Sequence, residues 1–291
     1  MTGASLWGLY RKTNVAAHRI EKIPRTMIDT HCHLDLIAAK TDLADVLEGA
    51  RAAGVEGIIV PGINEENWTD IAQLAQQHSD IYYALGFHPL FLSGVSSASI
   101  ERLKQVFVQA RGLPNKCVAI GECGLDFYHL GQDCDVELVK QQQKQILREH
   151  ILLANKAKLP VILHCRKAHQ DMMALLRKTA PIYGGVIHGF SGSYQQAMEY
   201  IKLGIYIGVG GVISYERAKK TRDTISKLPL EYLLIETDAP DMPLSGYQGA
   251  INKPEMLKLT LSTLIMLRSE SAQTVTSQLQ NNSKSLFFIC D

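Results

Sequence analysis

Six side chains of the kinds that bind divalent metal ions are spread along the chain, and each follows a short apolar run. They are four histidines and two acids: His31, His33, Glu122, His164, His188 and Asp238. An apolar run that ends in a polar residue is typical of a buried strand that carries the polar group at its C-terminal end. Groups gathered in this way could hold two cations, which can activate water and stabilise the attacking and leaving oxygens of a hydrolysis.

A single pair such as His31 and His33 is weak evidence for a metal, because buried histidines are often satisfied by backbone groups. The two are separated by one residue, so on a strand both imidazoles point to the same side. Six polar groups that converge on one buried point would each need a partner, and a pair of cations supplies all of them. We therefore predict a metal site in which Glu122 can bridge two ions. Mixed imidazole and carboxylate ligands suit Zn²⁺ or Mn²⁺, and Mg²⁺ if water completes its coordination.

Short apolar runs alternate with longer amphipathic stretches from Met27 onwards. The eight expected strands are residues 27–28, 57–60, 81–85, 117–120, 161–163, 185–187, 205–209 and 233–235. Strands that alternate with helices predict a parallel sheet, and eight such units predict a single-domain α/β fold, the closed (β/α)8 TIM-type barrel. An open doubly wound sheet is the alternative. In a barrel the active site lies at the C-terminal ends of the strands, where all six candidate ligands fall.

Several helices are expected between these runs. Apolar residues between positions 43 and 50 recur with helical spacing, and Gly54 can end that helix. Further helices are expected at 135–158, 171–178 and 271–287. Pro254 is placed as the first residue of another helix, with Asn252 nearby as a possible cap.

Composition excludes several classes of protein. The 291 residues are 46% hydrophobic and 20% charged with a net charge of +1, so no overall basic field holds nucleic acid. No apolar stretch reaches the roughly 18 residues of a membrane span. The six cysteines include no C-x-x-C pair, and we expect free thiols in a reducing compartment, the cytoplasm.

Residues 1–26 differ from the rest of the chain. They carry five basic residues against one acid, Glu21, and lack the apolar core of a secretory signal. Such an arm resembles a transit peptide. We favour instead an appended segment that packs poorly, followed by a hydrolase barrel over residues 27–291.

The motifs, in their order, resemble those of the TatD family of metal-dependent deoxyribonucleases over residues 27–288. The strings that carry the resemblance lie at 28–35, 86–89, 121–126, 161–166, 188–192 and 236–240, and the stretch 236–255 looks like the YjjV branch of that family. The resemblance implies a barrel that hydrolyses DNA, often from the 3′ end, with divalent metal. It implies one ion held by His31, His33, Glu122 and Asp238 and another held by Glu122, His164 and His188. Asp238 would also orient or deprotonate the attacking water.

Three departures from the family pattern fall at the barrel mouth. Phe127, Tyr128 and His129 follow the Gly-Leu-Asp motif, where many members carry an arginine. Gly189 follows His188 in place of the frequent cysteine, and the segment 239–243 that follows Asp238 reads Ala-Pro-Asp-Met-Pro. These changes concern the substrate and leave the expected metal ligands intact.

Four further polar residues are candidates, each with a structural alternative. His88 could contact a substrate phosphate or a third ion, or it could be a structural histidine. Arg166 could clamp a phosphate oxygen, or it could form a salt bridge across the barrel rim. Asp35 and Asp126 could accept hydrogen bonds from ligand imidazoles, or they could cap helices.

Aromatic and basic residues near the strand ends suggest contacts with a polynucleotide. Tyr128, Phe190 and Tyr247 could stack on bases, although aromatic side chains more often belong to the core. The basic stretch 215–227 could guide a polynucleotide to the mouth, although a solvated helix face is the commoner role. The segment 208–211 is rich in glycine but lacks the ending of a phosphate-binding P-loop, so we expect a closely packed loop.

Three functions follow from these observations. The first is a phosphodiesterase that acts on DNA with two metal ions. The second is a metal-dependent amide or ester hydrolase such as a D-aminoacyl-tRNA deacylase, which the same ligands would serve. The third, a metal-binding scaffold, is disfavoured because a full set of ligands at a barrel mouth has no evident structural use. No protein partner is indicated, and we expect a monomer.

Overall fold

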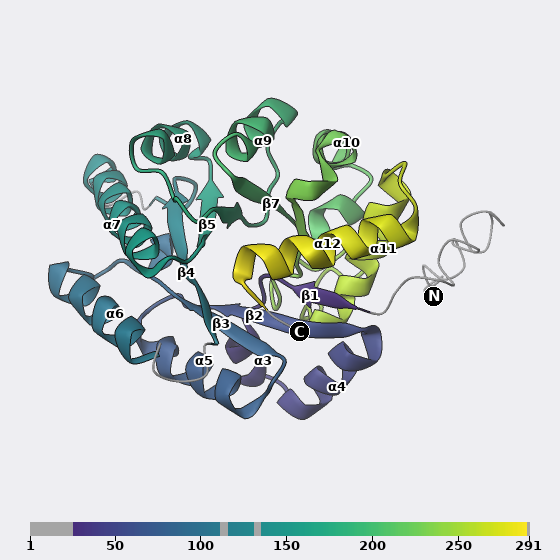
Figure 1. Ribbon diagram of the computed structural model, residues 1–291, viewed down its shortest axis with the longest axis horizontal. Coiled ribbons are helices and arrows are strands. Elements are labelled where there is room, and N and C mark those ends of the chain that lie inside the picture. Colours follow the sequence, from purple (N-terminus) through teal and green to yellow (C-terminus); the bar gives the residue numbers. More distant parts are fainter. Residues whose placement is uncertain (1–25, 111–115, 131–134, 290–291) are drawn as a thin grey trace.

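Strands and helices alternate along the chain in the computed structural model, which describes residues 26–110, 116–130 and 135–289 (Figure 1). The strands are β1 (Met27–Asp29), β2 (Val55–Pro61), β3 (Ile81–Leu85), β4 (Cys117–Asp126), β5 (Val161–Arg166), β6 (Gly185–Ile187), β7 (Ile205–Val209) and β8 (Leu233–Ile235). The α-helices are α3 (Leu34–Ala38), α4 (Leu43–Ala53), α5 (Glu65–Gln77), α6 (Ser97–Ala110), α7 (Val136–Ala157), α8 (His169–Lys178), α9 (Tyr194–Ile201), α10 (Lys219–Lys227), α11 (Leu257–Leu267) and α12 (Ala272–Phe287). Short 3-10 helices are η1 (Pro89–Phe91), η2 (Gly211–Ser214), η3 (Leu230–Tyr232) and η4 (Pro254–Met256). The extension expected at 1–26 lies outside the described residues except for Thr26.

All strands are parallel and follow one another in the order of the sequence, from β1 to β8. The first and last strands meet through the segments that follow them. Thr30 N donates to Ile235 O at 3.2 Å, and Asp238 N donates to His31 O at 2.9 Å. The predicted (β/α)8 barrel is therefore confirmed, and the helices surround its strands (Figure 1).

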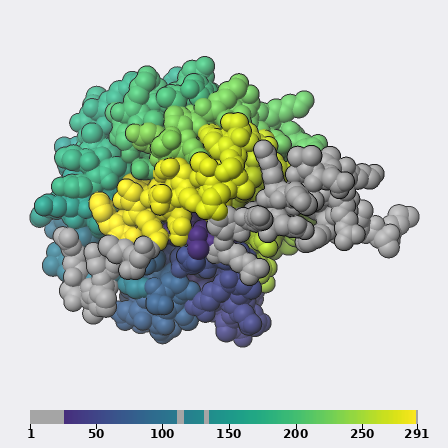
Figure 2. Space-filling view, turned by 45° about the vertical axis from the view of Figure 1, so that its right-hand side comes forward, coloured from purple at the N-terminus to yellow at the C-terminus, as the bar shows by residue number. Residues whose placement is uncertain are grey.

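One end of the barrel interior is filled by apolar side chains. Seven strands and the end of α12 contribute to one cluster, formed by Ile28, Ile59, Ala84, Val118, Ile162, Val186, Leu234, Leu286 and Phe287. In Figure 2 the yellow C-terminal helices extend across this face of the molecule, with the purple start of β1 at their edge. The candidate ligands follow the opposite ends of the strands, so packing closes one end and the other remains for chemistry.

A second apolar layer lies between the strands and the surrounding helices. In α4, Val46, Leu47 and Ala50 are buried, and the helix ends as predicted at Gly54, whose φ of 92° suits glycine. The long helix α7 matches the expected range 135–158, since Asp135 caps its start. This layer fixes each helix against the sheet.

The loop after β8 differs from the prediction. Pro254 begins η4 as expected, but Asn252 does not cap it. The side-chain amide of Asn252 instead donates to Thr237 O at 2.9 Å and to Asp241 O at 2.9 Å. Met242 O accepts from the same amide at 3.3 Å, so three carbonyl groups bind Asn252 to the loop that carries Asp238.

Two strands are longer than their apolar runs. Strand β4 continues to Asp126 and β5 to Arg166, so Glu122 and His164 lie within strands and not after them. Strand β1 ends at Asp29, and His31 and His33 lie in the segment beyond it. Polarity alone could not show this, because a polar side chain that points into a barrel mouth can still belong to a hydrogen-bonded strand.

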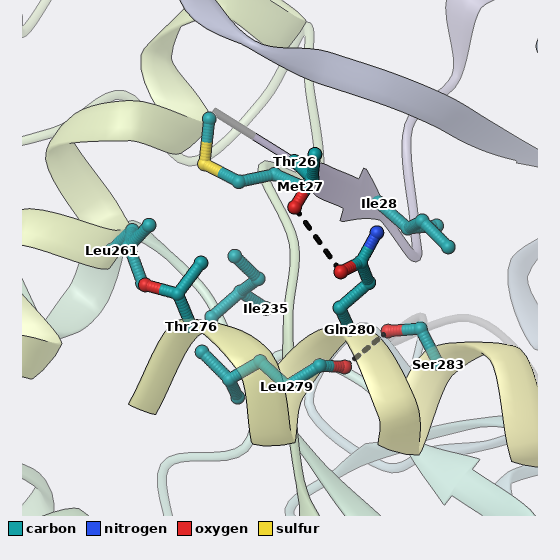
Figure 3. Close-up of a pocket in the computed structure, with 9 residues that line it drawn as sticks. All are labelled: Thr26, Met27, Ile28, Ile235, Leu261, Thr276, Leu279, Gln280 and Ser283. Carbon is teal, nitrogen blue, oxygen red and sulfur yellow. Dashed lines mark hydrogen bonds between the residues drawn. The ribbon is translucent and has the colours of Figure 1, made fainter. Parts of the chain in front are cut away.

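A small cavity lies beside the start of β1, against α11 and α12 (Figure 3). Thr26 Oγ1 donates to Gln280 Oε1 at 3.1 Å across its edge, and no candidate ligand lines it.

No helix among the described residues is long and apolar enough to cross a membrane. Cys32, Cys117, Cys123 and Cys165 are not joined in disulfides, as expected, whereas Cys134 and Cys290 lie outside the described residues.

Candidate metal centre

The carboxylate of Glu122 lies at the centre of the cluster, with the side chain only 1% exposed. One of its oxygens faces the residues after β1: Oε2 is 3.1 Å from His31 Nε2 and 3.6 Å from His33 Nε2. Asp238 approaches the same two rings, since its Oδ1 is 3.5 Å from His31 Nε2 and 3.8 Å from His33 Nε2. Four residues far apart in the sequence therefore meet on this side, which we call the Oε2 side.

The other oxygen of Glu122 faces three imidazoles on the opposite side, which we call the Oε1 side. Oε1 is 2.8 Å from His188 Nε2, 3.0 Å from His164 Nδ1 and 3.3 Å from His88 Nε2. The four predicted histidines thus converge on the Glu122 carboxylate, and Asp238 reaches two of them. His88, for which a substrate contact, a third ion and a structural role are the predicted alternatives, reaches Glu122 as well.

Several buried polar atoms of the cluster have no hydrogen-bond partner. They are the Nδ1 atoms of His31, His33 and His188, whereas His31 Nε2 and Glu122 Oε2 lie 3.1 Å apart and have each other, Asp238 and His33 as near polar neighbours. Buried polar groups are nearly always paired, so unpaired ones need an explanation. The sets His31–His33–Asp238, His31–Glu122–His188 and His88–Glu122–His164 each offer ligand atoms within 4.8 Å of one another. The donor types and the unpaired atoms fit divalent ions.

Charge and burial act against each other in the cluster. Burial lowers the pKa of His31 to about 4, which leaves that ring neutral. Burial also opposes charge on His188, but the neighbouring Glu122 carboxylate outweighs it and raises the pKa of His188 to about 10. Burial disfavours the ionised form of Glu122, yet the surrounding imidazoles hold its pKa well below the usual range. Without metal, a proton on His188 therefore balances Glu122, and a cation could replace it.

The ring of His164 is oriented by Asp126, as predicted. Burial opposes charge on His164, but Asp126 Oδ2, 3.2 Å from Nε2, and Glu122 Oε1, 3.0 Å from Nδ1, both accept from the ring and raise its pKa. The bond to Asp126 leaves Nδ1 as the nitrogen that a metal would take in exchange for its proton. Asp35 does not play the same part. Its Oδ2 accepts a hydrogen bond from Asn67 Nδ2 at 3.1 Å.

His88 presents a donor and not a lone pair to the cluster. Burial lowers the pKa of His88 and keeps the ring neutral. Its Nδ1 accepts a hydrogen bond from Leu90 N at 3.2 Å, so the ring proton lies on Nε2, the atom nearest Glu122. The residue before it is held by a buried histidine of α7, because Phe87 N donates to His150 Nε2 at 3.0 Å. These contacts favour a donor role for His88 over a third metal ion.

Two buried acids beside the cluster were not predicted as site residues. Asp29 accepts hydrogen bonds from Thr237 Oγ1 at 2.6 Å and Thr237 N at 3.0 Å, which ties the end of β1 to the segment that carries Asp238. Glu236 accepts from Gly189 N and lies 4.0 Å from His188 Nδ1. The signal in the sequence was an acid directly after or within an apolar run, where burial demands a partner.

The glycine-rich segment 208–211, at the end of β7, leaves room for the side chain of Glu236. A Cβ at Gly208 would come within 2.5 Å of Glu236 Oε2, so only glycine leaves room for that carboxylate. Gly211 likewise lies against the loop after β8. The expectation of a closely packed loop in this segment is confirmed.

Aromatic residues predicted near the mouth separate into two groups. Phe190 is 2% exposed and belongs to the core, so it is unavailable for stacking on a base. Tyr128 and Tyr247 are 56% and 39% exposed. Arg166 lies over the Tyr128 ring, with its guanidinium carbon 4.2 Å from the ring centre.

In the stretch 215–227, Thr221, Thr224 and Ile225 face the core, and the basic side chains occupy other faces of α10.

Comparison with known proteins identifies the family. The sequence model named TatD related DNase matches residues 28–288. The chain belongs to the TatD family. Escherichia coli (strain K12) has a relative named uncharacterized metal-dependent hydrolase YjjV, which is 45% identical over 260 residues that cover 89% of this chain and 97% of the relative. The predicted resemblance to the YjjV branch is thereby confirmed.

A solved structure and a further relative support the same family. The crystal structure of YjjV from Escherichia coli matches with a TM-score of 0.85 and 44% identity over 92% of this chain and all of the other. A protein of Klebsiella pneumoniae (strain 342) named 3′-5′ ssDNA/RNA exonuclease TatD is 32% identical over 90% of this chain and 98% of its own length. This protein is therefore a metal-dependent hydrolase of the TatD family.

Proposed function

We propose that this TatD-family hydrolase cleaves phosphodiester bonds of DNA and removes nucleotides from the 3′ end. One observation carries the proposal: the Glu122 carboxylate lies between two sets of nitrogen and oxygen ligands, with Oε2 facing one set and Oε1 facing the other. Two divalent ions about 3.5–4 Å apart are a recurring solution for phosphodiester cleavage. The Klebsiella relative named as an exonuclease supports the same substrate class.

The proposed ligands divide between the two sides. His31, His33, Glu122 and Asp238 would hold one ion, and Glu122, His164 and His188 would hold the other. The ions, when bound, would neutralise charge on the phosphate and make water more acidic. We leave the metal as Zn²⁺, Mn²⁺ or Mg²⁺, since imidazole and carboxylate ligands suit each to a different degree.

The chain's own groups would handle protons and position the substrate. Asp238 keeps partial access to solvent, with its side chain 13% exposed, and its carboxylate would accept a proton from the attacking water. His88 Nε2–H would donate to a phosphate oxygen, which agrees with the hydrogen bond that its other nitrogen accepts from Leu90 N. Arg166 would pair with a second phosphate.

A direct assay tests the proposal. Purified protein is incubated with Mg²⁺, Mn²⁺ or Zn²⁺ and single-stranded DNA labelled at its 5′ end, with Glu122→Gln as the inactive control. We expect release of nucleotides from the 3′ end, seen as a ladder of shortened labelled products, which the control lacks. Hydrolysis of a D-aminoacyl-tRNA ester without release of nucleotides would contradict the nuclease and favour the deacylase.

We further propose that the protein acts as a monomer in the cytoplasm. The reduced thiols of Cys32, Cys123 and Cys165 agree with a reducing compartment. All six proposed ligands come from one chain, so the site needs no second copy.

A further inference from the structure

Tyr128 and Arg166 form an exposed pair at the mouth of the barrel. They follow or end neighbouring strands, since Asp126 of β4 is the register partner of Arg166 of β5. Phe127 N donates to Arg166 O at 2.8 Å and extends this pairing by one step. The Tyr128 ring is 56% exposed, and the Arg166 guanidinium lies over it. Large aromatic surface left in water beside a catalytic cluster is a candidate contact for a ligand.

The guanidinium has no acidic partner within the part of the chain that the structure describes. The salt bridge across the rim, the structural alternative for Arg166, is therefore not found among the described residues. The guanidinium stacks on Tyr128 and its N–H donors can still reach an anion. A phosphate is the anion whose geometry such a fork matches best.

One carboxylate connects this pair to the metal cluster. Asp126 Oδ1 accepts hydrogen bonds from Tyr128 N at 2.8 Å and from His129 N at 3.0 Å. Its Oδ2 lies 3.2 Å from His164 Nε2. The position of the Tyr128 ring is thus fixed relative to the Oε1 side of the cluster, because both depend on the same buried acid.

The neighbouring loop is fixed to the same place. Gln143 of α7 accepts from Asp126 N at 2.9 Å, and its amide donates to Asp126 O and to Pro89 O. Phe91, which is 46% exposed, ends the short helix that begins at Pro89. The turn that carries the exposed Phe91 is therefore connected through Gln143 to the end of β4, two residues before Tyr128.

We propose that Tyr128 and Arg166 form a nucleotide subsite, in which an unpaired base stacks on Tyr128 and an adjacent phosphate pairs with Arg166. This inference rests on the proposed nuclease function and deepens it, because a base within a duplex could not stack there. Aromatic rings combined with a cation are the usual means of gripping single strands without reading their sequence. The occupant is therefore the single-stranded end of a polynucleotide.

Binding and turnover are measured separately to test this subsite. Fluorescence anisotropy in EDTA follows binding of a labelled single-stranded oligonucleotide and of the same strand with abasic sites in place of its last two 3′ nucleotides. Kinetics with Mn²⁺ follow release of nucleotides. We expect wild-type protein to prefer the normal strand, and Tyr128→Ala to weaken its binding and raise KM by about 5- to 100-fold, since one stacked base is worth that much. Tyr128→Ala should no longer distinguish the two strands, whereas Tyr128→Phe should.

Arg166 is tested by the dependence of binding on salt. Arg166→Ala should lower the slope of log K against log salt concentration by about 0.7, the value of one phosphate contact on a single strand. Arg148→Ala removes a similar charge from α7, where the side chain is 58% exposed, and should leave the slope unchanged. An equal change in both variants would overturn the phosphate contact.

The outcomes separate this subsite from the proposed function. Wild-type protein that lacks a preference for the normal strand, or Tyr128→Ala that keeps the preference, overturns the subsite even if DNA is degraded. If wild-type protein prefers the normal strand but releases no nucleotides, the result contradicts the proposed nuclease function and supports the subsite. Equal binding of a blunt duplex and a single strand also overturns the subsite.

Discussion

The two sides of the Glu122 carboxylate are built by different means. On the Oε1 side, each of two rings is fixed by a hydrogen bond on its far nitrogen: His164 by Asp126 and His88 by the backbone of Leu90. The third ring of that side, His188, has no hydrogen bond on Nδ1, and on the Oε2 side neither His31 nor His33 has one on Nδ1. On the Oε2 side the backbone positions the ligands, because the segments after β1 and β8 are joined by hydrogen bonds.

The two sides of Glu122 therefore differ in what orients their histidine rings. Side-chain hydrogen bonds on the Oε1 side select one ring nitrogen as the potential ligand before any ion arrives. On the Oε2 side the Nε2 atoms of His31 and His33 face Glu122 and Asp238, but no hydrogen bond fixes the far nitrogen of either ring. The Oε1 side should therefore retain its geometry without metal, whereas the Oε2 side should depend on metal for order.

The change with the largest expected effect removes the group that both sides share. Glu122→Gln replaces an ionised carboxylate that faces five imidazoles, so both proposed ions lose a ligand. We expect hydrolysis to fall below detection and the metal content to drop on both sides, as measured by mass spectrometry. Glu137→Gln, at an exposed position of α7, is the matched control. Full activity of Glu122→Gln would refute a shared carboxylate.

A change confined to the Oε2 side should separate chemistry from folding. Asp238→Asn keeps the shape of the side chain but removes a proton acceptor, so kcat should fall by about 10²- to 10⁴-fold. The melting temperature should change little, because the side chain is not part of the core. Steady-state kinetics and thermal unfolding on the same preparation make the comparison. An unchanged kcat would leave Asp238 with a purely structural role.

A change behind the Oε1 side tests whether a hydrogen bond organises the ligand. Asp126→Asn weakens the contact that orients His164, and metal affinity or activity should fall by about 10- to 100-fold. Asp35→Asn is the comparison, because Asp35 contacts Asn67 and no imidazole. Competition with a chelating dye measures affinity in each variant. Equal losses in both would mean that buried charge, and not orientation of His164, matters.

The pH should alter metal binding by displacement of protons. Ionised Glu122 raises the pKa of His188 to about 10 in the metal-free protein despite burial, so the ring is protonated below that pH. A metal must displace this proton, and affinity should therefore rise about tenfold for each pH unit and each proton released. Titrations at several pH values between about 6.5 and 8.5 test this expectation. Affinity that stays flat over this window would show that no proton leaves.

The stability of the metal-free protein should change with pH in the opposite direction to its metal affinity. A pKa that is raised on folding stabilises the metal-free protein most below the ordinary pKa of histidine, near 6.5, and this contribution is lost as pH approaches about 10. Metal-free protein should therefore lose stability as the pH rises through this window, while the metal-bound protein gains ligand affinity.

The sequence predicted the barrel and the convergence of the six candidates for one physical reason. A parallel sheet with a single order of strands brings all its C-terminal ends together, so a polar residue after each apolar run must meet the others. What it could not predict is the role of groups that act through hydrogen bonds. Whether Asp35 or Asp126 reaches an imidazole depends on the element that holds each one, helix α3 for Asp35 and the end of β4 for Asp126, and both belong to equally plausible motifs.

Buried partners far apart in the sequence were also beyond prediction. Asp29 and Thr237 are joined across the meeting point of the first and last strands, and no local pattern connects them. The niche for Glu236 requires Gly208 on another strand. Local sequence could not decide between the two roles predicted for Phe190, a contact for bases or a place in the core, and the structure shows the core.

Counting the ions held by each side tests the central claim most directly. Metal analysis is carried out on wild-type protein, His31→Ala and His164→Ala after saturation and removal of excess ions. The account predicts two ions per chain in wild-type protein and about one in each variant, retained by the side that was left intact. A wild-type chain that binds no more than one ion, or variants that bind as many as wild type, would contradict it.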